Sequence, residues 1–181
     1  EKIASLRANT EVNSLHISLN FDPSEKIENG KLKQIATEYM DGIGFGNISQ
    51  RNGQSNSFVI SGSATGSVPM LSSAHFSLVL KTDPMLNKLW CTGPHIASSE
   101  AMSHAAFYTI LPHINAVIHV HHEKLWQKYL FSLPTTAPEA TYGSPEMVKE
   151  IERLLSDPTV ADGNMMFMAG HTDGIFAFGT D

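Results

Sequence analysis

The sequence contains a single cysteine, Cys91, so no disulfide can form within the chain. One unpaired cysteine is typical of proteins from reducing compartments, and we expect a cytoplasmic location. Apolar runs stay far shorter than the ~20 residues needed to cross a bilayer, which predicts no membrane partner. Basic residues are also scarce, with 12 lysines and arginines against 18 acids and a net charge of −6. A chain without a basic surface is not expected to bind nucleic acid.

The composition is that of an ordinary globular protein. Hydrophobic residues make up 41% of the 181 positions and charged residues 17%, which is enough to build a substantial core. We expect one domain over residues 1–181, without repeats or a linker. Residues 1–30 are polar and weakly patterned, and no role follows from them. Histidine is frequent, with nine in the chain, and this favours a site built from imidazole groups.

Strands and helices are expected in alternation, which predicts an α/β domain. Ser98 is the expected N-cap of one helix, which Pro112 would end. Ser144 and Pro145 begin another helix, whose apolar stripe runs to Leu155. The other expected helices cover residues 31–40 and 123–130, and the expected strands cover residues 58–60, 76–80, 116–121, 165–169 and 175–178.

The most informative stretch is the apolar run that carries His119 and His121. Side chains of a strand alternate between its faces, so these two imidazoles point the same way and could share one metal ion. A third histidine, His171, lies between two further apolar runs. Three histidines from two strands would make the three-ligand, open-position site of catalytic zinc. The alternative is that His119 and His121 are simply polar residues on a solvated face.

Glu100 stands at the start of an expected helix, where a carboxylate usually serves the helix dipole. Beside a metal ion it would instead be an extra ligand or a general base. His104 follows one helical turn later on the same face. We expect His104 to be a surface histidine or a hydrogen-bonded structural one, so that its replacement by alanine has little effect.

Two glycine-rich stretches fail the usual nucleotide motifs. Residues 42–47 nearly match the dinucleotide fingerprint but end in Asn47 and follow an expected helix rather than a strand. Residues 61–67 lack both the lysine of a P-loop and the central serine of a nucleophile elbow. Their small residues and hydroxyls could still bind an anion, although an ordinary tight turn is the simpler interpretation.

Taken together, six short motifs resemble the class II aldolase/adducin family, whose sugar-phosphate members include fuculose-phosphate aldolases. They occur in family order between residues 46 and 171, about two thirds of the chain. Each motif alone is weakly specific, but six in order are improbable by chance. They are Gly46-Asn47-Ile48-Ser49, Ile60-Ser61-Gly62 leading to Thr65-Gly66, Ser98-Ser99-Glu100, His119-Val120-His121, Tyr142-Gly143-Ser144-Pro145-Glu146 and Gly170-His171.

The resemblance implies a three-layer α/β/α fold around a mostly antiparallel sheet, and a homotetramer with active sites near subunit interfaces. It implies that His119, His121 and His171 hold a divalent metal, usually Zn2+, with Mn2+, Co2+ or Fe2+ as alternatives. Glu100 would be the catalytic acid/base. The residues that would bind the substrate's phosphate are Asn47, Thr65, Gly66, Ser98 and Ser99.

The implied activity is that of a metal-dependent aldolase, a lyase that cleaves a sugar or sugar phosphate by a retro-aldol reaction. A divalent cation held by neutral imidazoles would stabilise the enediolate that forms as the C–C bond breaks. Glu100 would move the proton next to the carbonyl. The same scaffold also carries epimerases, dehydratases and decarboxylases, and these remain alternatives because the site decides the reaction. A non-catalytic, adducin-like interaction domain is a further alternative, although such domains lack the metal ligands that this chain retains.

Three departures from the family pattern bear on the site. The loop at 61–66 is about two residues longer than usual, so Ser61, Gly62 or Ser63 could replace Thr65 and Gly66 as anion contacts. The tyrosine that donates a proton in some family aldolases has no secure counterpart, and Tyr129 and Tyr142 are the candidates. The sequence ends at Asp181, where family members usually continue into a further helix.

Overall fold

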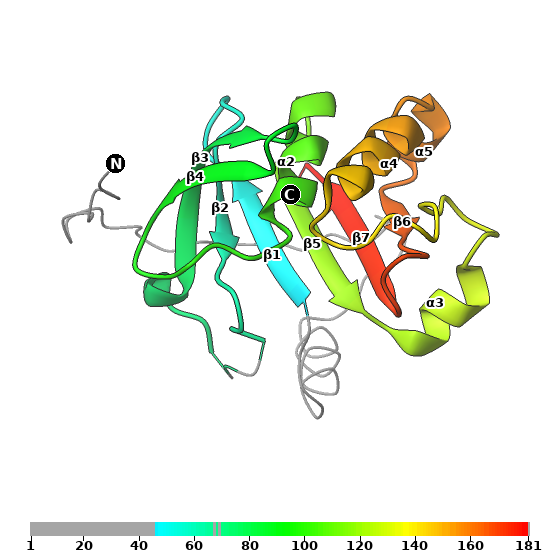
Figure 1. Ribbon diagram of the computed structural model, residues 1–181, viewed down its shortest axis with the longest axis horizontal. Helices are drawn as coiled ribbons and strands as arrows, with labels where there is room; N and C mark the ends of the chain where they lie inside the picture. The colour runs from blue at the N-terminus through cyan, green and yellow to red at the C-terminus, as the bar shows by residue number, and fades with distance from the viewer. Residues whose placement is uncertain (1–45, 67, 69, 181) are drawn as a thin grey trace.

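A computed structural model describes residues 46–66, 68 and 70–180. Within these residues, seven strands form one open sheet in the order β4-β3-β2-β1-β5-β7-β6 (Figure 1). Every neighbouring pair of these strands is antiparallel, which confirms the expected α/β fold around an antiparallel sheet. The helix expected over 31–40 lies outside the described residues, as do residues 1–30.

The elements follow the chain in this order. The strands are β1 (Gly46–Arg51), β2 (Phe58–Ser61), β3 (Phe76–Asp83), β4 (Lys88–Thr92), β5 (Ala116–His121), β6 (Met165–Phe167) and β7 (Gly174–Gly179). The helices are η1 (Ser73–His75), α2 (Ala101–Ile110), α3 (Glu123–Tyr129), α4 (Pro145–Leu155) and α5 (Pro158–Asp162). None of the helices described here is long and apolar enough to cross a membrane.

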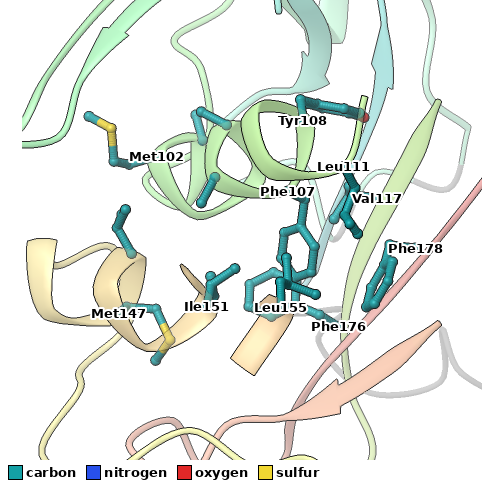
Figure 2. Close-up of a cluster of buried hydrophobic side chains, with 14 of the residues drawn as sticks. Met102, Phe107, Tyr108, Leu111, Val117, Met147, Ile151, Leu155, Phe176 and Phe178 are labelled. Atoms are coloured by element: carbon teal, nitrogen blue, oxygen red, sulfur yellow. The ribbon is translucent and has the colours of Figure 1, made fainter. Parts of the chain in front are cut away.

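The core lies between the sheet and the helices α2 and α4, which contact each other (Figures 1 and 2). Phe107 of α2 packs against Phe176 and Phe178 of β7, with ring centroids 5.2 and 4.9 Å apart. The side chains of Met147 and Ile151 on α4 face the same cluster (Figure 2). The stripe predicted for α4 is therefore buried as expected, and Ser144 caps the helix by accepting a hydrogen bond from Met147 N.

Arg51 joins the end of β1 to the end of α2. Its buried guanidinium donates to the carbonyl oxygens of Tyr108, Leu111 and Ile114 at 2.8, 3.0 and 2.8 Å. Tyr108 and Leu111 belong to the last turn and C-cap of α2, whose terminal carbonyls have no intrahelical partner. The arginine thereby holds α2 against the sheet.

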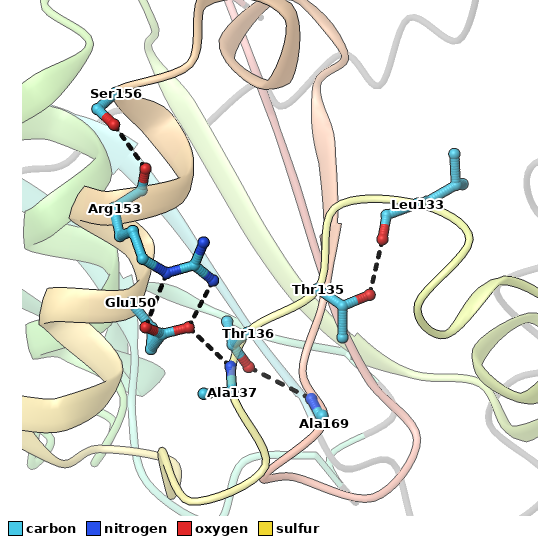
Figure 3. A network of polar contacts seen from close by, with 8 residues as sticks. All are labelled: Leu133, Thr135, Thr136, Ala137, Glu150, Arg153, Ser156 and Ala169. Atoms are coloured by element: carbon cyan, nitrogen blue, oxygen red, sulfur yellow. Dashed lines mark hydrogen bonds and ion pairs between the residues drawn. The ribbon is translucent and has the colours of Figure 1, made fainter.

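A second polar network holds the loop that follows α3 (Figure 3). Glu150 of α4 accepts a hydrogen bond from Ala137 N at 2.7 Å and binds Arg153 through both carboxylate oxygens. The neighbouring Thr136 hydroxyl accepts from Ala169 N. These contacts tie residues 136–137 both to α4 and to the segment that precedes the His171 turn.

Some elements differ from the sequence prediction. Strands β1 and β4 and the short helix α5 were not expected, because their sequences are polar or short. The helix α2 begins two residues later than expected, with Glu100 rather than Ser98 at its N-cap position. Ser98 instead accepts a hydrogen bond from Glu100 N at 3.3 Å, just ahead of the helix.

Candidate active site

Three histidines converge at one end of the sheet, as the sequence predicts. β5 contributes His119 and His121, and the turn between β6 and β7 contributes His171. One ligand atom from each imidazole lies within 4.8 Å of the others, and the Nε2 atoms of His119 and His121 are 3.1 Å apart. His119 is 1% exposed, whereas His121 and His171 are partly buried. The alternative of a solvated face does not hold for His119.

The backbone around β5 brings these side chains together. β7 pairs with β5 so that Gly174 lies opposite His121, and the turn closes with a bond from Gly174 N to His171 O. A Cβ on Gly174 would lie 2.8 Å from Cδ2 of His171, so a glycine there leaves room for the imidazole. On the other side of β5, a Cβ on Gly46 would lie 2.6 Å from the His119 oxygen, and Gly46 allows β1 to approach.

All three imidazoles are biased toward the neutral form, which is the form that binds metals. Burial, together with the positive charge that His121 can carry, lowers the pKa of His171 to about 4. Burial and the neighbouring histidines hold the pKa of His119 well below its usual value. The pKa of His121 is lowered by burial as well. The donor set and its geometry therefore fit a divalent cation.

Glu100 is the carboxylate next to this cluster. Its Oε2 lies 3.2 Å from His119 Nε2 and accepts a hydrogen bond from Asn47 Nδ2 at 2.7 Å. Asn47 reaches it because β1 pairs with β5, with Asn47 opposite His119. Burial raises the pKa of Glu100 to about 7, and the bond from Asn47 opposes that rise. The carboxyl group can thus exchange a proton near neutral pH.

The segments expected to bind an anion lie side by side. Gly62 forms a bridge with Ala97, and Ser63 N donates to Ile96 O at 2.9 Å. This places the loop that contains Thr65 and Gly66 against the residues that precede Ser98 and Ser99.

The hydroxyl groups of this region are unequally available. Thr65 is buried and its hydroxyl donates to Gly62 O, while Ser61 accepts from Ile48 N and Ser63 donates to Ala97 O. Ser99 is exposed. The Ser99 side chain is therefore accessible, whereas the Thr65 hydroxyl has a partner inside the loop.

Tyr142 is the better placed of the two candidate tyrosines. Its ring centroid lies 4.5 Å from that of His171, and its side chain is exposed. The next residue, Gly143, approaches Ser99 so closely that a Cβ would lie 2.9 Å from the Ser99 oxygen. Tyr129 instead packs near Phe167, with ring centroids 6.1 Å apart.

Of the two alternatives expected for His104, the structure shows the hydrogen-bonded structural histidine rather than the surface one. It is fully buried, and its Nδ1 lies 2.6 Å from the Ser49 hydroxyl. Its Nε2 has no hydrogen-bond partner within the described part of the chain. Ser49 was predicted only as part of a family motif, without a role of its own. The spacing of Asn47 and Ser49 on one strand face, opposite Glu100 and His104 on one helix face, was the available signal.

Comparison with family models identifies the family of the chain. The family model for the class II aldolase and adducin N-terminal domain matches residues 32–181. The chain therefore belongs to the class II aldolase/adducin family. A second model, the MobA/VirD2-like nuclease domain of relaxases, matches residues 1–51. That match covers too little of the chain to assign a second family, and it lies almost entirely outside the described residues.

Solved structures of related fold are similar over most of the chain. An L-fuculose 1-phosphate aldolase matches with a TM-score of 0.58 and 20% identity, over 84% of this chain and 74% of its own. A sugar-phosphate aldolase from Thermotoga maritima matches with a TM-score of 0.57 and 16% identity, over 83% and 84%. YgbL from Klebsiella pneumoniae, described as a putative aldolase/epimerase/decarboxylase, matches with a TM-score of 0.58 and 17% identity, over 84% of this chain and 78% of its own. No curated protein sequence matches the chain significantly.

Proposed function

We propose that this protein is a metal-dependent lyase that cleaves a sugar or sugar phosphate by a retro-aldol reaction. The observation that carries this proposal is the convergence of three neutral histidines beside one buried carboxylate, Glu100, 3.2 Å from His119. A metal ligand set and a proton-transfer group are the two parts that such a cleavage needs. Family membership and the fold of two sugar-phosphate aldolases support the substrate class.

His119, His121 and His171 would hold the metal, and Zn2+ suits three imidazoles with an open position. Mn2+, Co2+ or Fe2+ would also accept these ligands. When bound, the cation supplies a Lewis acid that withdraws charge from a hydroxy-carbonyl group.

The protein's own residues would divide the remaining work. Glu100, with a pKa of about 7, takes or gives the proton on the substrate. Asn47 fixes the carboxylate through the bond to its Oε2. The backbone of Thr65 and Gly66, together with Ser98 and Ser99, binds the substrate's anionic group just ahead of α2. Tyr142, beside His171, is the candidate proton donor.

A second candidate reaction at the same site is an epimerisation or a decarboxylation, the alternatives named for YgbL. Both need the same cation and the same mobile proton, so the ligand set does not separate them. An adducin-like interaction domain, in contrast, needs neither the three ligands nor Glu100.

The proposal includes a homo-oligomer that works in the cytoplasm, with the tetramer as the expected state. Several large apolar side chains are exposed on the single chain, and contacts between subunits would cover them. They include Met70, Met85, Leu86, Ile96 and Phe131. Light scattering after size-exclusion chromatography measures the state, and a monomer at micromolar concentration would contradict the tetramer.

The deciding experiment is elemental analysis of the purified protein and of His119→Ala, followed by an assay of aldol cleavage. We expect about one divalent ion per chain in the wild type and almost none in the variant. Fuculose 1-phosphate and related sugar phosphates are the first substrates to assay, with the released aldehyde as the readout. Absence of metal even after incubation with Zn2+ or Mn2+ would remove the lyase proposal and favour an interaction domain.

A further inference from the structure

A row of polar side chains lies between β1 and α2. On β1, Asn47 and Ser49 share one face because they are two residues apart. Glu100, His104 and Tyr108 lie four residues apart at the start of α2 and along it, and they also share one face. Asn47 binds Glu100 at 2.7 Å, and Ser49 Oγ lies 2.6 Å from His104 Nδ1 and 2.8 Å from the Tyr108 hydroxyl. The row therefore begins at Glu100 and continues into the core.

This row is deeply buried. His104 and Tyr108 are 0% exposed and Ser49 is 1% exposed. Polar groups in such a place destabilise the fold unless every hydrogen bond is made, and a complete network orders its members. The row is therefore well suited to hold one of its own members in a fixed orientation.

The partners of Tyr108 and Ser49 determine where the protons of the row lie. Besides Ser49, the Tyr108 hydroxyl has the Asn115 oxygen as an acceptor, at 3.5 Å, which is long for an O–H donor. Either hydroxyl can be the donor in the 2.8 Å contact between Tyr108 and Ser49. With the tyrosine as the donor, the single proton of Ser49 goes to His104 Nδ1. Burial lowers the pKa of His104 to about 3, so the ring is neutral and carries its one proton on Nε2.

His104 Nε2 and Glu100 Oε1 are two unpartnered polar atoms on residues one helical turn apart. Both atoms are buried, and neither has a hydrogen-bond partner among the described residues. The bond from His104 N to Glu100 O closes the helical turn between them, and side chains of a helix lean toward its N-terminus. The imidazole therefore leans over the turn that carries Glu100. One is a donor and the other an acceptor, and leaving either unpaired is unfavourable.

We propose that His104 is a positioning residue for Glu100, in which Ser49 and Tyr108 fix the imidazole as the Nε2–H tautomer and the Nε2–H group holds the second carboxylate oxygen through one bound water. Asn47 holds the first oxygen. Asn47 on β1 and His104 on α2 then each hold one oxygen of the carboxylate, and together they set its orientation toward His119. The catalytic consequence rests on the role proposed for Glu100, whereas the tautomer and the contact do not.

The tautomer is measured first, by two-bond ¹⁵N–¹H NMR of the histidine rings in the zinc-loaded chain. The His104 signals are assigned by their loss in His104→Asn. We expect the Nε2–H pattern in the wild type and a mixture of tautomers in Ser49→Ala, which no longer donates to Nδ1. A wild-type ring protonated on Nδ1 would overturn the proposal whatever reaction the protein catalyses.

The contact with Glu100 is measured next, through the ¹³C shift of its carboxyl carbon. We expect this shift to move in His104→Asn and in Ser49→Ala, and to stay in place in His113→Asn, whose imidazole is exposed. Two amides at position 104 test whether a donor must lie at the position of Nε2. Glutamine places its NH2 group near that position, and asparagine does not. His104→Gln should return the shift toward the wild-type value, and an unmoved shift in His104→Asn would overturn the proposal.

Turnover provides the third measurement in an active enzyme. We expect His104→Asn to lower kcat for aldol cleavage about 10- to 100-fold, as loss of an outer hydrogen bond in metal enzymes does. KM and the metal content should stay near wild type, and His104→Gln should recover part of kcat. If asparagine and glutamine lowered thermal stability alike and left kcat per metal-loaded chain unchanged, His104 would be structural only. If the wild type did not cleave the aldol substrates, the lyase proposal would fail. The two NMR measurements would still decide whether His104 positions Glu100.

Discussion

Asn47 and Glu100, 53 positions apart in the sequence, are joined by a hydrogen bond of 2.7 Å from the amide to the carboxylate. The bond connects the first residues of β1 to the start of α2, next to His119. It opposes the effect of burial on the pKa of Glu100. The pKa of the proposed acid/base is thus set by two opposing effects, burial and the hydrogen bond from one amide.

Removal of this donor should disturb the balance. In Asn47→Ala, the carboxylate loses its hydrogen bond while burial remains, so the pKa of Glu100 rises above its present value of about 7. Less of the charged form is then present at neutral pH, and the acidic limb of the kcat profile shifts to higher pH. We expect activity at about pH 7 to fall about 10-fold or more. The control is Asn52→Ala, because Asn52 is exposed; an unshifted acidic limb in Asn47→Ala would contradict the role of the bond.

Glu100→Gln separates proton transfer from metal binding. Glutamine keeps the shape of the side chain but has no proton to exchange near neutral pH. We expect the metal content to stay near one ion per chain and kcat to fall about 10²- to 10⁴-fold, the usual contribution of a general acid or base. A variant that turned over at nearly the wild-type rate would show that another group moves the proton.

His121→Ala tests the ligand set from the strand. Its Nε2 lies 3.1 Å from that of His119, and two remaining imidazoles hold a divalent ion much less tightly than three. We expect the loss of nearly all bound metal and of all turnover. His113→Ala is the matched control because its side chain is exposed. Elemental analysis distinguishes the two variants, and full metal content in His121→Ala would mean that the site has been assigned to the wrong histidines.

Apolar runs and their periodicity were sufficient to predict the strand that carries His119 and the amphipathic helix α4. Both elements form because one of their faces is buried, and a buried face requires apolar residues at regular spacing in the sequence. The turn at His171 was also predictable, because two apolar runs flank it.

β1 could not be predicted in the same way. Its sequence is Gly46-Asn47-Ile48-Ser49-Gln50-Arg51, which is too polar to suggest a strand in the middle of a sheet. It is stable there because α2 supplies hydrogen-bond partners to Asn47, Ser49 and Arg51. Those partners come from more than 50 positions away in the sequence, so no local pattern reveals them. For the same reason, the sequence could not decide between a surface position and a buried, hydrogen-bonded one for His104.

Arg51 should be important for stability rather than for activity. Arg51→Met keeps much of the side-chain volume but leaves the carbonyl oxygens of Tyr108, Leu111 and Ile114 without their donor. We expect the free energy of unfolding to fall by about 2–4 kcal/mol, measured by urea denaturation. Arg153→Met is the comparison, since Arg153 is exposed in its pair with Glu150 and the pair should contribute less than about 1 kcal/mol. Equal losses in the two variants would show that the contacts of Arg51 with α2 add little.

The burial of His104 also predicts how stability depends on pH. Its pKa is about 3 in the folded protein and 6.5 when the ring is solvated, so the unfolded chain binds the proton first as the pH falls. Stability is therefore complete above the unfolded pKa and is lost progressively between that value and the folded one, by about 1.4 kcal/mol per pH unit. His104→Gln has no such group. In metal-free proteins, the stability of the wild type relative to His104→Gln should thus be about 1.4 kcal/mol lower at about pH 5.5 than at about pH 8. Histidines 119, 121 and 171 titrate in both proteins and cancel in the difference. A difference that did not change with pH would mean that the His104 ring is accessible to protons in the folded state, and so that the row beneath Glu100 is open to solvent.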